Sequence, residues 1–412
     1  MKRVVCSLIR ACCRYRFPLA LMAVAIVCGG GNFLLAAESI SVGETVRIAS
    51  KVLGEERTLL ISTPANYTKS SERYPVFYMT DGDSHLLHTR GTLDFLARNG
   101  RMPDCILVGV TNTDRNRDLT PTRWNYQGED GSRFAMPSSG GADKFLDFFA
   151  QELFPYIESH YRTSPYRIFA GHSLGGLLAL HILATRHELF QACIAVSPSL
   201  NWDDGYPLRA VAKFLQSQKE CRRTLFVSMA NEESGSNRPT RLDRLKGILG
   251  ASETKGFIWD SRQMEDEDHG SVVLRSHYWG LRLIFRDWQL PASPGNRPFA
   301  GTLEEFKAHY AGLSRRMEYA VLPPEQTVNL FGYQLLGRRK AEEAIAVFRY
   351  NVELYPESAN VYDSLGEALE GSGRVREAHE NYASAVEKAA RIGDSRLAVY
   401  TRNRDRTAAA VK

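Results

Sequence analysis

The chain has 412 residues, of which 43% are hydrophobic and 24% charged, and it contains 32 glycines and 17 prolines. This composition is typical of a globular protein, and the length allows more than one domain of the usual ~100–200 residues. The formal net charge of +5 equals the charge of the five basic residues that precede residue 38, so residues 38–412 are neutral overall. A neutral body offers no electrostatic attraction for nucleic acid, and we expect no nucleic-acid partner.

Residues 1–37 are predicted to be a secretory signal peptide. The basic residues of this segment are Lys2, Arg3, Arg10, Arg14 and Arg16. They lead into an apolar stretch, 17–28, and small residues follow before an expected cleavage near Ala37. The apolar stretch is too short to span a bilayer comfortably. We therefore expect a secreted protein of the bacterial periplasm, without a stable membrane span after signal removal; an uncleaved signal anchor is the alternative.

Three cysteines follow this leader, namely Cys105, Cys193 and Cys221, and they show no CxxC or metal-binding spacing. Cys105 and Cys193 lie in strand-like segments, so we expect buried free thiols rather than disulfides. The chain contains no HExxH motif and no paired His/Cys spacing. We therefore expect neither a metal nor a cofactor.

From residue 39 to residue 291, β-type segments alternate with helical stretches. We expect strands at 45–50, 58–63, 75–80, 105–110, 167–170, 193–197, 224–229 and 257–264. We expect helices at 141–160, 175–186 and 207–219. A charged turn separates the first two strands, which predicts a hairpin, and most of the others are uninterrupted apolar segments, as in strands covered on both faces. The alternation predicts an α/β fold with a mainly parallel central sheet flanked by helices.

Beyond a Pro- and Gly-rich stretch at 290–301, only helical segments are expected. Three residues of this region recur 34 positions later, as Gly332/Gly366, Ala344/Ala378 and Phe348/Tyr382. This period resembles the tetratricopeptide repeat, in which small residues let paired helices pack closely, and it implies a surface for a protein partner. An ordinary helix pair is the alternative. Two units are fewer than a free-standing solenoid needs, so we expect them to pack on a flanking helix such as 303–319 or on the α/β body.

The segment Gly171-His172-Ser173-Leu174-Gly175 lies between an expected strand and an expected helix. A serine between two glycines in this context has the form of a nucleophile elbow, because the glycines remove Cβ clashes in the tight turn that exposes the hydroxyl. A serine hydroxyl becomes a nucleophile at neutral pH only beside a general base. Ser173 is therefore the candidate nucleophile.

His269 is the candidate base. In α/β-hydrolases the chain order is nucleophile, acid and base, with the histidine after the last strand. His269 follows the expected strand at 257–264 and precedes a helix. The other histidines after Ser173 lie on the helix after the elbow, within the helix after His269 or in the helical tail: His181, His187, His277, His309 and His379.

The candidate acids are Glu232 and Glu233, which follow the strand at 224–229. A carboxylate at this place can hold the histidine tautomer and stabilise the imidazolium. Three carboxylates directly before the base are rivals, although their pattern is also that of a solvated acidic turn: Asp266, Glu267 and Asp268.

The oxyanion hole needs backbone N–H groups directed at the developing charge. Leu174, directly after the nucleophile, supplies one such group, and we expect the other from Gly82 or Asp83, after the third strand.

Three residues are candidates for the substrate pocket: Arg115, Asp118 and Trp202. Arg115 and Asp118 lie in the loop after the fourth strand, at the carboxyl edge of the sheet where ligands bind. An internal Arg–Asp pair that stiffens this loop is equally compatible with the sequence. Trp202 is either a wall of the pocket or a core residue.

Seven segments follow one another in the order of a known family: YPVFYMTDGD, VGVTNTDRNRDLTPT, GGADKFLDFFAQELFPYIESHYRT, FAGHSLGG, SPSLNWDD, ANEES and DEDHGSVV…GLRLIF. They resemble the putative-esterase family of α/β-hydrolases, which includes siderophore trilactone esterases, feruloyl and acetylxylan esterases, S-formylglutathione hydrolase and mycolyltransferases. The resemblance covers residues 39–290. It implies an α/β-hydrolase fold with Ser173 as nucleophile, His269 as base and the acid at Glu232 or Glu233. Glu232 is preferred, because Asn-Glu at the strand end is the usual arrangement in this family.

Together, the predicted leader and the resemblance imply a secreted serine esterase that hydrolyses a small-molecule or glycan-linked carboxylic ester through an acyl-enzyme intermediate. The alternatives are an acyltransferase with the same triad and a non-catalytic tetratricopeptide-type binding protein on a hydrolase scaffold. The expected organisation is a signal peptide (1–37), an α/β-hydrolase esterase domain (38–291), a linker and helical connection (292–326), tetratricopeptide-like repeats (327–390) and a C-terminal tail (391–412).

Overall fold

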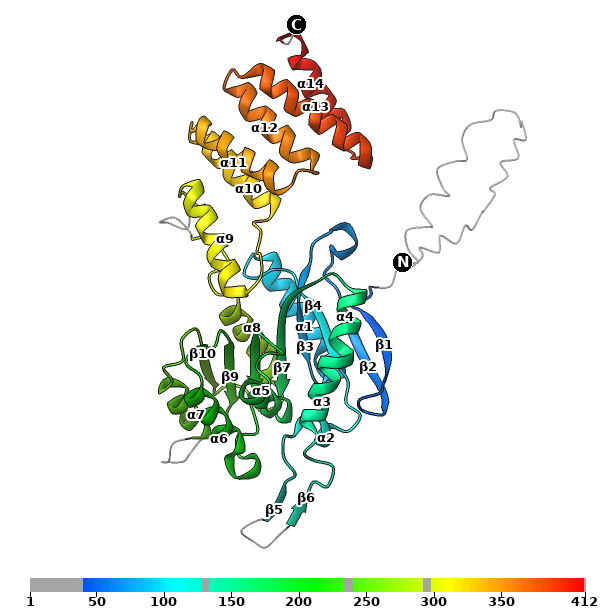
Figure 1. The fold of residues 1–412 in the computed structure, drawn as a ribbon, viewed down its shortest axis with the longest axis vertical. Coiled ribbons are helices and arrows are strands. Elements are labelled where there is room, and N and C mark those ends of the chain that lie inside the picture. Colours follow the sequence, from blue (N-terminus) through cyan, green and yellow to red (C-terminus); the bar gives the residue numbers. More distant parts are fainter. Residues whose placement is uncertain (1–39, 128–132, 233–239, 292–297, 411–412) are drawn as a thin grey trace, which may run out of the picture. The chain divides into compact units, whose positions relative to one another are not determined.

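The computed structural model describes residues 40–127, 133–232, 240–291 and 298–410 (Figure 1). The predicted signal peptide lies outside these ranges, as does Glu233. Within them, no helix combines the length and the apolar character that a membrane span requires. Cys105, Cys193 and Cys221 are buried and free, as we predicted for the first two.

One sheet of eight strands forms the centre of the α/β part, in the order β1-β2-β4-β3-β7-β8-β9-β10. Its strands are β1 (Glu44–Ser50), β2 (Glu55–Ser62), β3 (Tyr74–Met79), β4 (Ile106–Val110), β7 (Thr163–His172), β8 (Ala192–Val196), β9 (Thr224–Ala230) and β10 (Ile258–Met264). β2 pairs antiparallel with β1 and β4, whereas the other pairings are parallel. The expected strands, the first hairpin and the mainly parallel sheet are confirmed. A separate small hairpin consists of β5 (Asn125–Gln127) and β6 (Arg133–Ala135).

The helices of this part are α1 (Gly82–Arg98), α2 (Arg115–Leu119), α3 (Ala142–Phe148), α4 (Phe154–His160), α5 (Leu174–Thr185), α6 (Trp202–Ser217), α7 (Arg241–Gly250) and α8 (Val272–Ile284). A π-helical segment, Phe149–Leu153, joins α3 to α4, so the helix predicted at 141–160 is present as one continuous stretch. Helices α5 and α6 confirm the other two predicted helices. The sequence pattern does not predict α1, because four of its six buried residues are glycine, threonine or arginine and give no apolar period.

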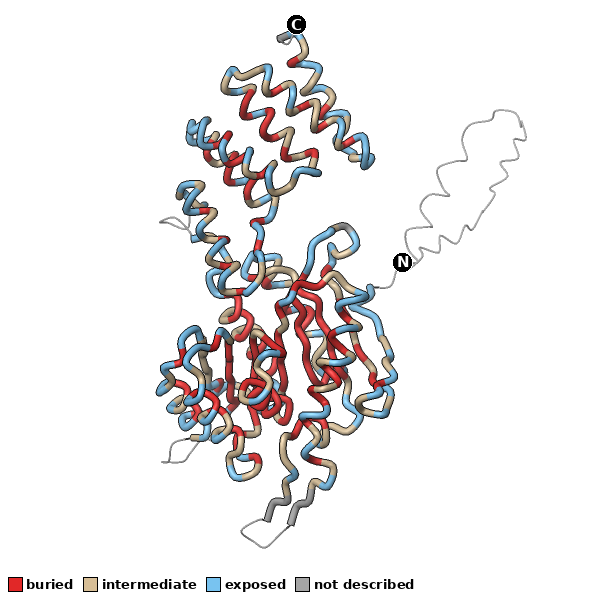
Figure 2. The backbone as a smooth tube through the Cα atoms, in the orientation of Figure 1, coloured by how far each residue is buried: buried red, intermediate tan, exposed pale blue. Residues whose placement is uncertain are grey.

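Hydrophobic side chains alternate between the two faces of the sheet. In β3, Val76 and Tyr78 belong to one core cluster and Phe77 and Met79 to the other, as the two-residue period of a strand requires. Helices α3 to α7 contribute to the first cluster, and α1 and α8 contribute to the second. Figure 2 shows the buried residues concentrated in the strands and along the helices that cover them. This arrangement is the α/β-hydrolase fold that the sequence implied.

The C-terminal part is helical, with α9 (Leu303–Met317), α10 (Glu325–Gly337), α11 (Ala341–Leu354), α12 (Ala359–Gly371), α13 (Val375–Ile392) and α14 (Leu397–Thr407). A glycine faces an aromatic ring in each of two helix pairs. A Cβ on Gly332 would lie 2.6 Å from the Phe348 ring, and a Cβ on Gly366 would lie 2.7 Å from the Tyr382 ring. The 34-residue spacing therefore corresponds to equivalent packing of α10 on α11 and of α12 on α13.

The repeated pairs also pack on neighbouring helices. Phe306 of α9 stacks on Phe331 of α10, with ring centroids 5.2 Å apart and planes 11° from parallel, as expected for a flanking helix. Residues 391–412, expected as a tail, contain α14, whose Tyr400 packs with Ala385 and Ala389 of α13. The assignment of these helices as tetratricopeptide repeats stays a prediction.

We expect Gly366→Ala to destabilise the helical part. The new Cβ would lie 2.7 Å from the buried Tyr382 ring, and such overpacking costs about 1–3 kcal/mol. Gly371→Ala in the same helix is the matched control, because no atom lies within 4 Å of its Cβ and alanine is the better helix former. Thermal unfolding of the full chain measures both variants. Equal melting temperatures for the two would contradict the packing described here.

Candidate active site

Ser173 lies in a tight turn between β7 and α5, with φ 60° and ψ −110°. Positive φ is uncommon for a residue with a Cβ, and it persists where the surroundings fix it. A Cβ on Gly171 would overlap with the backbone of Gly175, and a Cβ on Gly176 would lie 2.9 Å from the Cα of Pro198. The Ser173 N–H donates to the Val196 carbonyl at 2.9 Å. The glycines of the motif are therefore required by close backbone contacts.

His269 and Glu232 form an ion pair or hydrogen bond at the ends of the last two strands. His269 follows β10, Glu232 follows β9, and their Nδ1 and Oε1 atoms are 2.8 Å apart. A proton on Nδ1 directed at the carboxylate leaves Nε2 as the acceptor, which is the tautomer a general base needs. The two side chains are 46% and 31% exposed, so this pair lies at an open surface.

The other acidic candidates contact different groups. Asp266 and Glu267 accept from Arg275 at 2.6 and 3.0 Å, and Asp268 accepts from backbone N–H groups of its own turn. Glu233 lies outside the described residues. Among the described carboxylates, Glu232 is thus the one placed against His269.

The remaining histidines on helices near the elbow have other partners. His181 contacts Asp143 at 2.8 Å and Tyr206 at 2.9 Å. His277 is buried in α8, and its Nδ1 lies 2.9 Å from the Thr89 hydroxyl.

The turn between β3 and α1 lies beside the elbow. A Cβ on Gly175 would lie 2.5 Å from the Thr80 hydroxyl oxygen, which shows how closely the two turns approach. Gly82 begins α1 and packs against the backbone of Gly109, and Asp83, next in the helix, is exposed. Leu174 begins α5 directly after the nucleophile. The residues predicted for the oxyanion hole therefore lie in the two turns that meet here, and their role stays a prediction.

Arg115 links these two turns. Its Nε donates to Asp81 Oδ1 at 2.7 Å, and its Nη2 donates to Asp81 Oδ2 at 3.2 Å and to the His172 carbonyl at 3.0 Å. Asn112 donates to the same Asp81 carboxylate at 2.6 Å. Burial opposes ionisation of Asp81, but the hydrogen bonds from Arg115 and Asn112 outweigh it and lower the pKa of this carboxyl. The position of Arg115 after the fourth strand predicts a place at the pocket, but no local pattern in the sequence indicates its pairing with Asp81.

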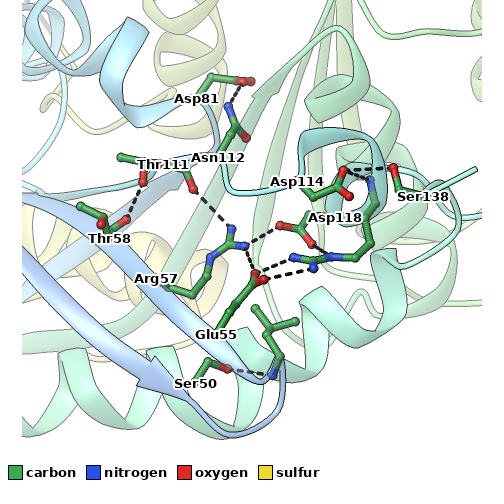
Figure 3. Close-up of polar contacts among 12 residues, drawn as sticks. Ser50, Glu55, Arg57, Thr58, Asp81, Thr111, Asn112, Asp114, Asp118 and Ser138 are labelled. Atoms are coloured by element: carbon green, nitrogen blue, oxygen red, sulfur yellow. Dashed lines mark hydrogen bonds and ion pairs between the residues drawn. The ribbon is translucent and has the colours of Figure 1, made fainter. Parts of the chain in front are cut away.

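Asp118, the second pocket candidate, lies in a buried ion-pair network (Figure 3). Its carboxylate accepts from Arg57 at 2.6 Å and from Arg117 at 2.7 Å, and both Arg57 and Asp118 are almost fully buried. Glu55 completes the network with contacts to both arginines. Hydrogen bonds from Arg117 and then Arg57 lower the pKa of Glu55. Asp118 therefore fixes its loop to the β1–β2 hairpin and does not line a pocket. This agrees with the alternative interpretation, an internal Arg–Asp pair that stiffens the loop.

Trp202 is also internal. Its side chain is buried, its indole N–H donates to the Thr122 hydroxyl at 2.9 Å, and its ring packs on Trp124 with centroids 4.6 Å apart. Of its two interpretations, the core position is the one found.

Two surface cavities lie away from these residues. One of about 460 Å³ lies between the end of α5 and α6, and one of about 1120 Å³ lies between α6 and α7. Neither is lined by Ser173, Glu232 or His269.

Known proteins resemble the chain over the part that carries these residues. The profile of the family described as Putative esterase matches residues 50–277. The ferri-bacillibactin esterase of Bacillus subtilis is 31% identical over 254 residues, which are 56% of this chain and 86% of that protein. The siderophore triacetylfusarinine C esterase of Aspergillus fumigatus is 27% identical over 271 residues, which are 57% and 90% of the two chains. An IroE-like serine hydrolase from Shewanella oneidensis is 28% identical with a TM-score of 0.65, over 76% of this chain and 99% of that chain.

We expect Asp118→Ala to destabilise the fold strongly, because it removes the buried carboxylate beside Arg57 and leaves that guanidinium with only the more exposed Glu55 as a carboxylate partner. Removing one member of a buried pair costs about 3–5 kcal/mol. Glu56→Ala is the matched control: Glu56 neighbours Arg57, but its pair with Arg47 is exposed, and such pairs contribute little. Urea unfolding of both variants measures the difference. A small effect of Asp118→Ala, equal to that of Glu56→Ala, would contradict the structural role of the network.

Proposed function

This chain belongs to the Putative esterase family and is a carboxylic ester hydrolase; we propose that Ser173 is its nucleophile, His269 its general base and Glu232 the acid. The observation that carries this proposal is the 2.8 Å contact between His269 Nδ1 and Glu232 Oε1 at the carboxyl edge of the sheet. The ring of His172, directly before Ser173, lies 4.5 Å from the ring of His269, which supports the proximity of nucleophile and base.

In the proposed reaction, the Ser173 Oγ attacks the ester carbonyl carbon while His269 Nε2 takes the hydroxyl proton. The carbonyl oxygen becomes negatively charged and is stabilised by the Leu174 N–H and by an N–H of the β3–α1 turn. Collapse of this intermediate breaks the ester C–O bond, and the alcohol leaves with the proton from His269. Water then attacks the acyl carbon and gives a proton to His269 Nε2. The bond between this carbon and Ser173 Oγ breaks, the Oγ takes the proton back from His269, and the carboxylic acid is released.

We propose siderophore esters as the substrate class. Two relatives are named as siderophore esterases, one for triacetylfusarinine C and one for enterobactin. The exposed fractions of 46% for His269 and 31% for Glu232 leave the proposed site open to a bulky ester. A panel of p-nitrophenyl esters, a trilactone siderophore and feruloyl esters tests this. Turnover of the trilactone above the others supports the proposal, and selective turnover of feruloyl esters contradicts it.

We expect Ser173→Ala and His269→Ala each to lower kcat by about 10³–10⁶-fold, with the double variant hardly worse, because the serine is activated only through the imidazole. Glu232→Gln should have a smaller effect. Asp266→Asn is the matched control, since Asp266 lies in the same loop as His269 but pairs with Arg275. Ester turnover and thermal unfolding of each variant measure these effects. A larger loss of turnover for Asp266→Asn than for Glu232→Gln would contradict Glu232 as the acid and assign this role to Asp266, in the loop that carries His269.

We further propose that the protein acts outside the cytoplasm after removal of its leader, because five basic residues precede an apolar stretch and small residues at its N-terminus. Intact-mass spectrometry of the protein from its native host should give a mature chain that begins near Glu38. A mass that includes Met1 would contradict this.

A further inference from the structure

The ring of His172 contacts the ring of the proposed base. His172 is the last residue of β7, and its ring lies against the ring of His269 with centroids 4.5 Å apart and planes at 46°. His172 is half-buried, whereas His269 is exposed. The more buried of the two rings therefore lies against the ring of the proposed base.

The main chain of His172 is itself held in place. Its carbonyl accepts from Arg115 Nη2 at 3.0 Å, and the same guanidinium is bound to the buried Asp81 carboxylate. In contrast, the Glu232–His269 pair is partly exposed, and an exposed pair holds its geometry weakly. Of these two neighbours of the His269 ring, His172 is thus the less exposed and Glu232 the more exposed.

The His172 imidazole is uncharged at neutral pH. Burial, assisted by the nearby His269 and His85, lowers the pKa of His172 to about 4, against a smaller effect of the Asp81 carboxylate. The ring of His85 lies 5.8 Å from that of His172, the ring of His88 follows at 5.1 Å, and burial lowers the pKa of both. At neutral pH, His172 is thus an uncharged aromatic surface beneath His269.

On the basis of the proposed triad, we propose that His172 is a positioning residue, which holds the His269 imidazole in the plane that directs Nε2 at the Ser173 hydroxyl. The contact between the two rings fixes this plane. A misplacement of about 1 Å in such a geometry is enough to lower a rate by about 10²-fold. The substrate does not contact His172 in this account, so its binding does not depend on the residue.

The test compares three variants of the full chain with p-nitrophenyl butyrate as substrate. We expect His172→Ala to lower kcat by about 10–100-fold with KM within about threefold of the wild type, because only the reacting geometry is lost. His172→Phe keeps the ring surface and should retain more activity than His172→Asn, which keeps a polar group without the ring. The control is His88→Phe, because His88 contacts His85 but not His269; it should leave kcat unchanged.

Wild-type kcat in a folded His172→Ala variant would overturn the proposal, as would a loss confined to KM. If His172→Ala does not fold, an activity of His172→Asn equal to or above that of His172→Phe overturns it. Ser173→Ala, measured in parallel, separates this inference from the proposed function. Turnover retained in Ser173→Ala would overturn both, whereas an inactive Ser173→Ala with a fully active His172→Ala would overturn the role of His172 alone.

Discussion

The close approach of the Gly171 and Gly175 backbones is the constraint on which the site depends. A Cβ on Gly171 would overlap with Gly175, so only glycine allows the chain to turn this tightly between β7 and α5. The turn holds Ser173 at φ 60°, a conformation that costs about 1–3 kcal/mol for a residue with a Cβ. The packed strand and helix on either side supply that energy. The serine hydroxyl consequently remains at the carboxyl edge of the sheet, where the loops after β3, β9 and β10 also begin.

The turn that carries Ser173 has paired charges on one side and neutral histidines on the other. On the side of β3 and β4, two buried carboxylates pair with arginines: Asp118 with Arg57 and Arg117, and Asp81 with Arg115. These pairs are directional, so they fix loops. On the side of α1, burial lowers the pKa of His85, whose ring contacts His172, and of His88, whose ring contacts His85. Ion pairs between side chains thus hold the loops. The His172 ring beside His269 is neutral, so it adds no positive charge that would oppose the His269 imidazolium of the proposed mechanism.

The sequence alone was sufficient for features that depend on local pattern or chain order. The eight strands, the glycine-flanked serine and a histidine after the last strand all have such signals. The sequence did not distinguish a pocket role from an internal role for Asp118 and Trp202. Their hydrogen-bond partners, Arg57 and Thr122, lie 61 and 80 residues away in the chain. The contact of His172 with His269 likewise has no local signal, since it arises only when β7 and the turn after β10 meet in the folded sheet.

The central claim is that Ser173 is an activated nucleophile, and reaction with a fluorophosphonate probe tests it most directly, because only a serine activated by a base reacts quickly. The account predicts rapid, stoichiometric labelling of the wild-type protein, with the modified peptide containing Ser173. It also predicts that His269→Ala slows this reaction strongly. Absence of labelling in the folded wild type, or modification of a different serine, would contradict the account.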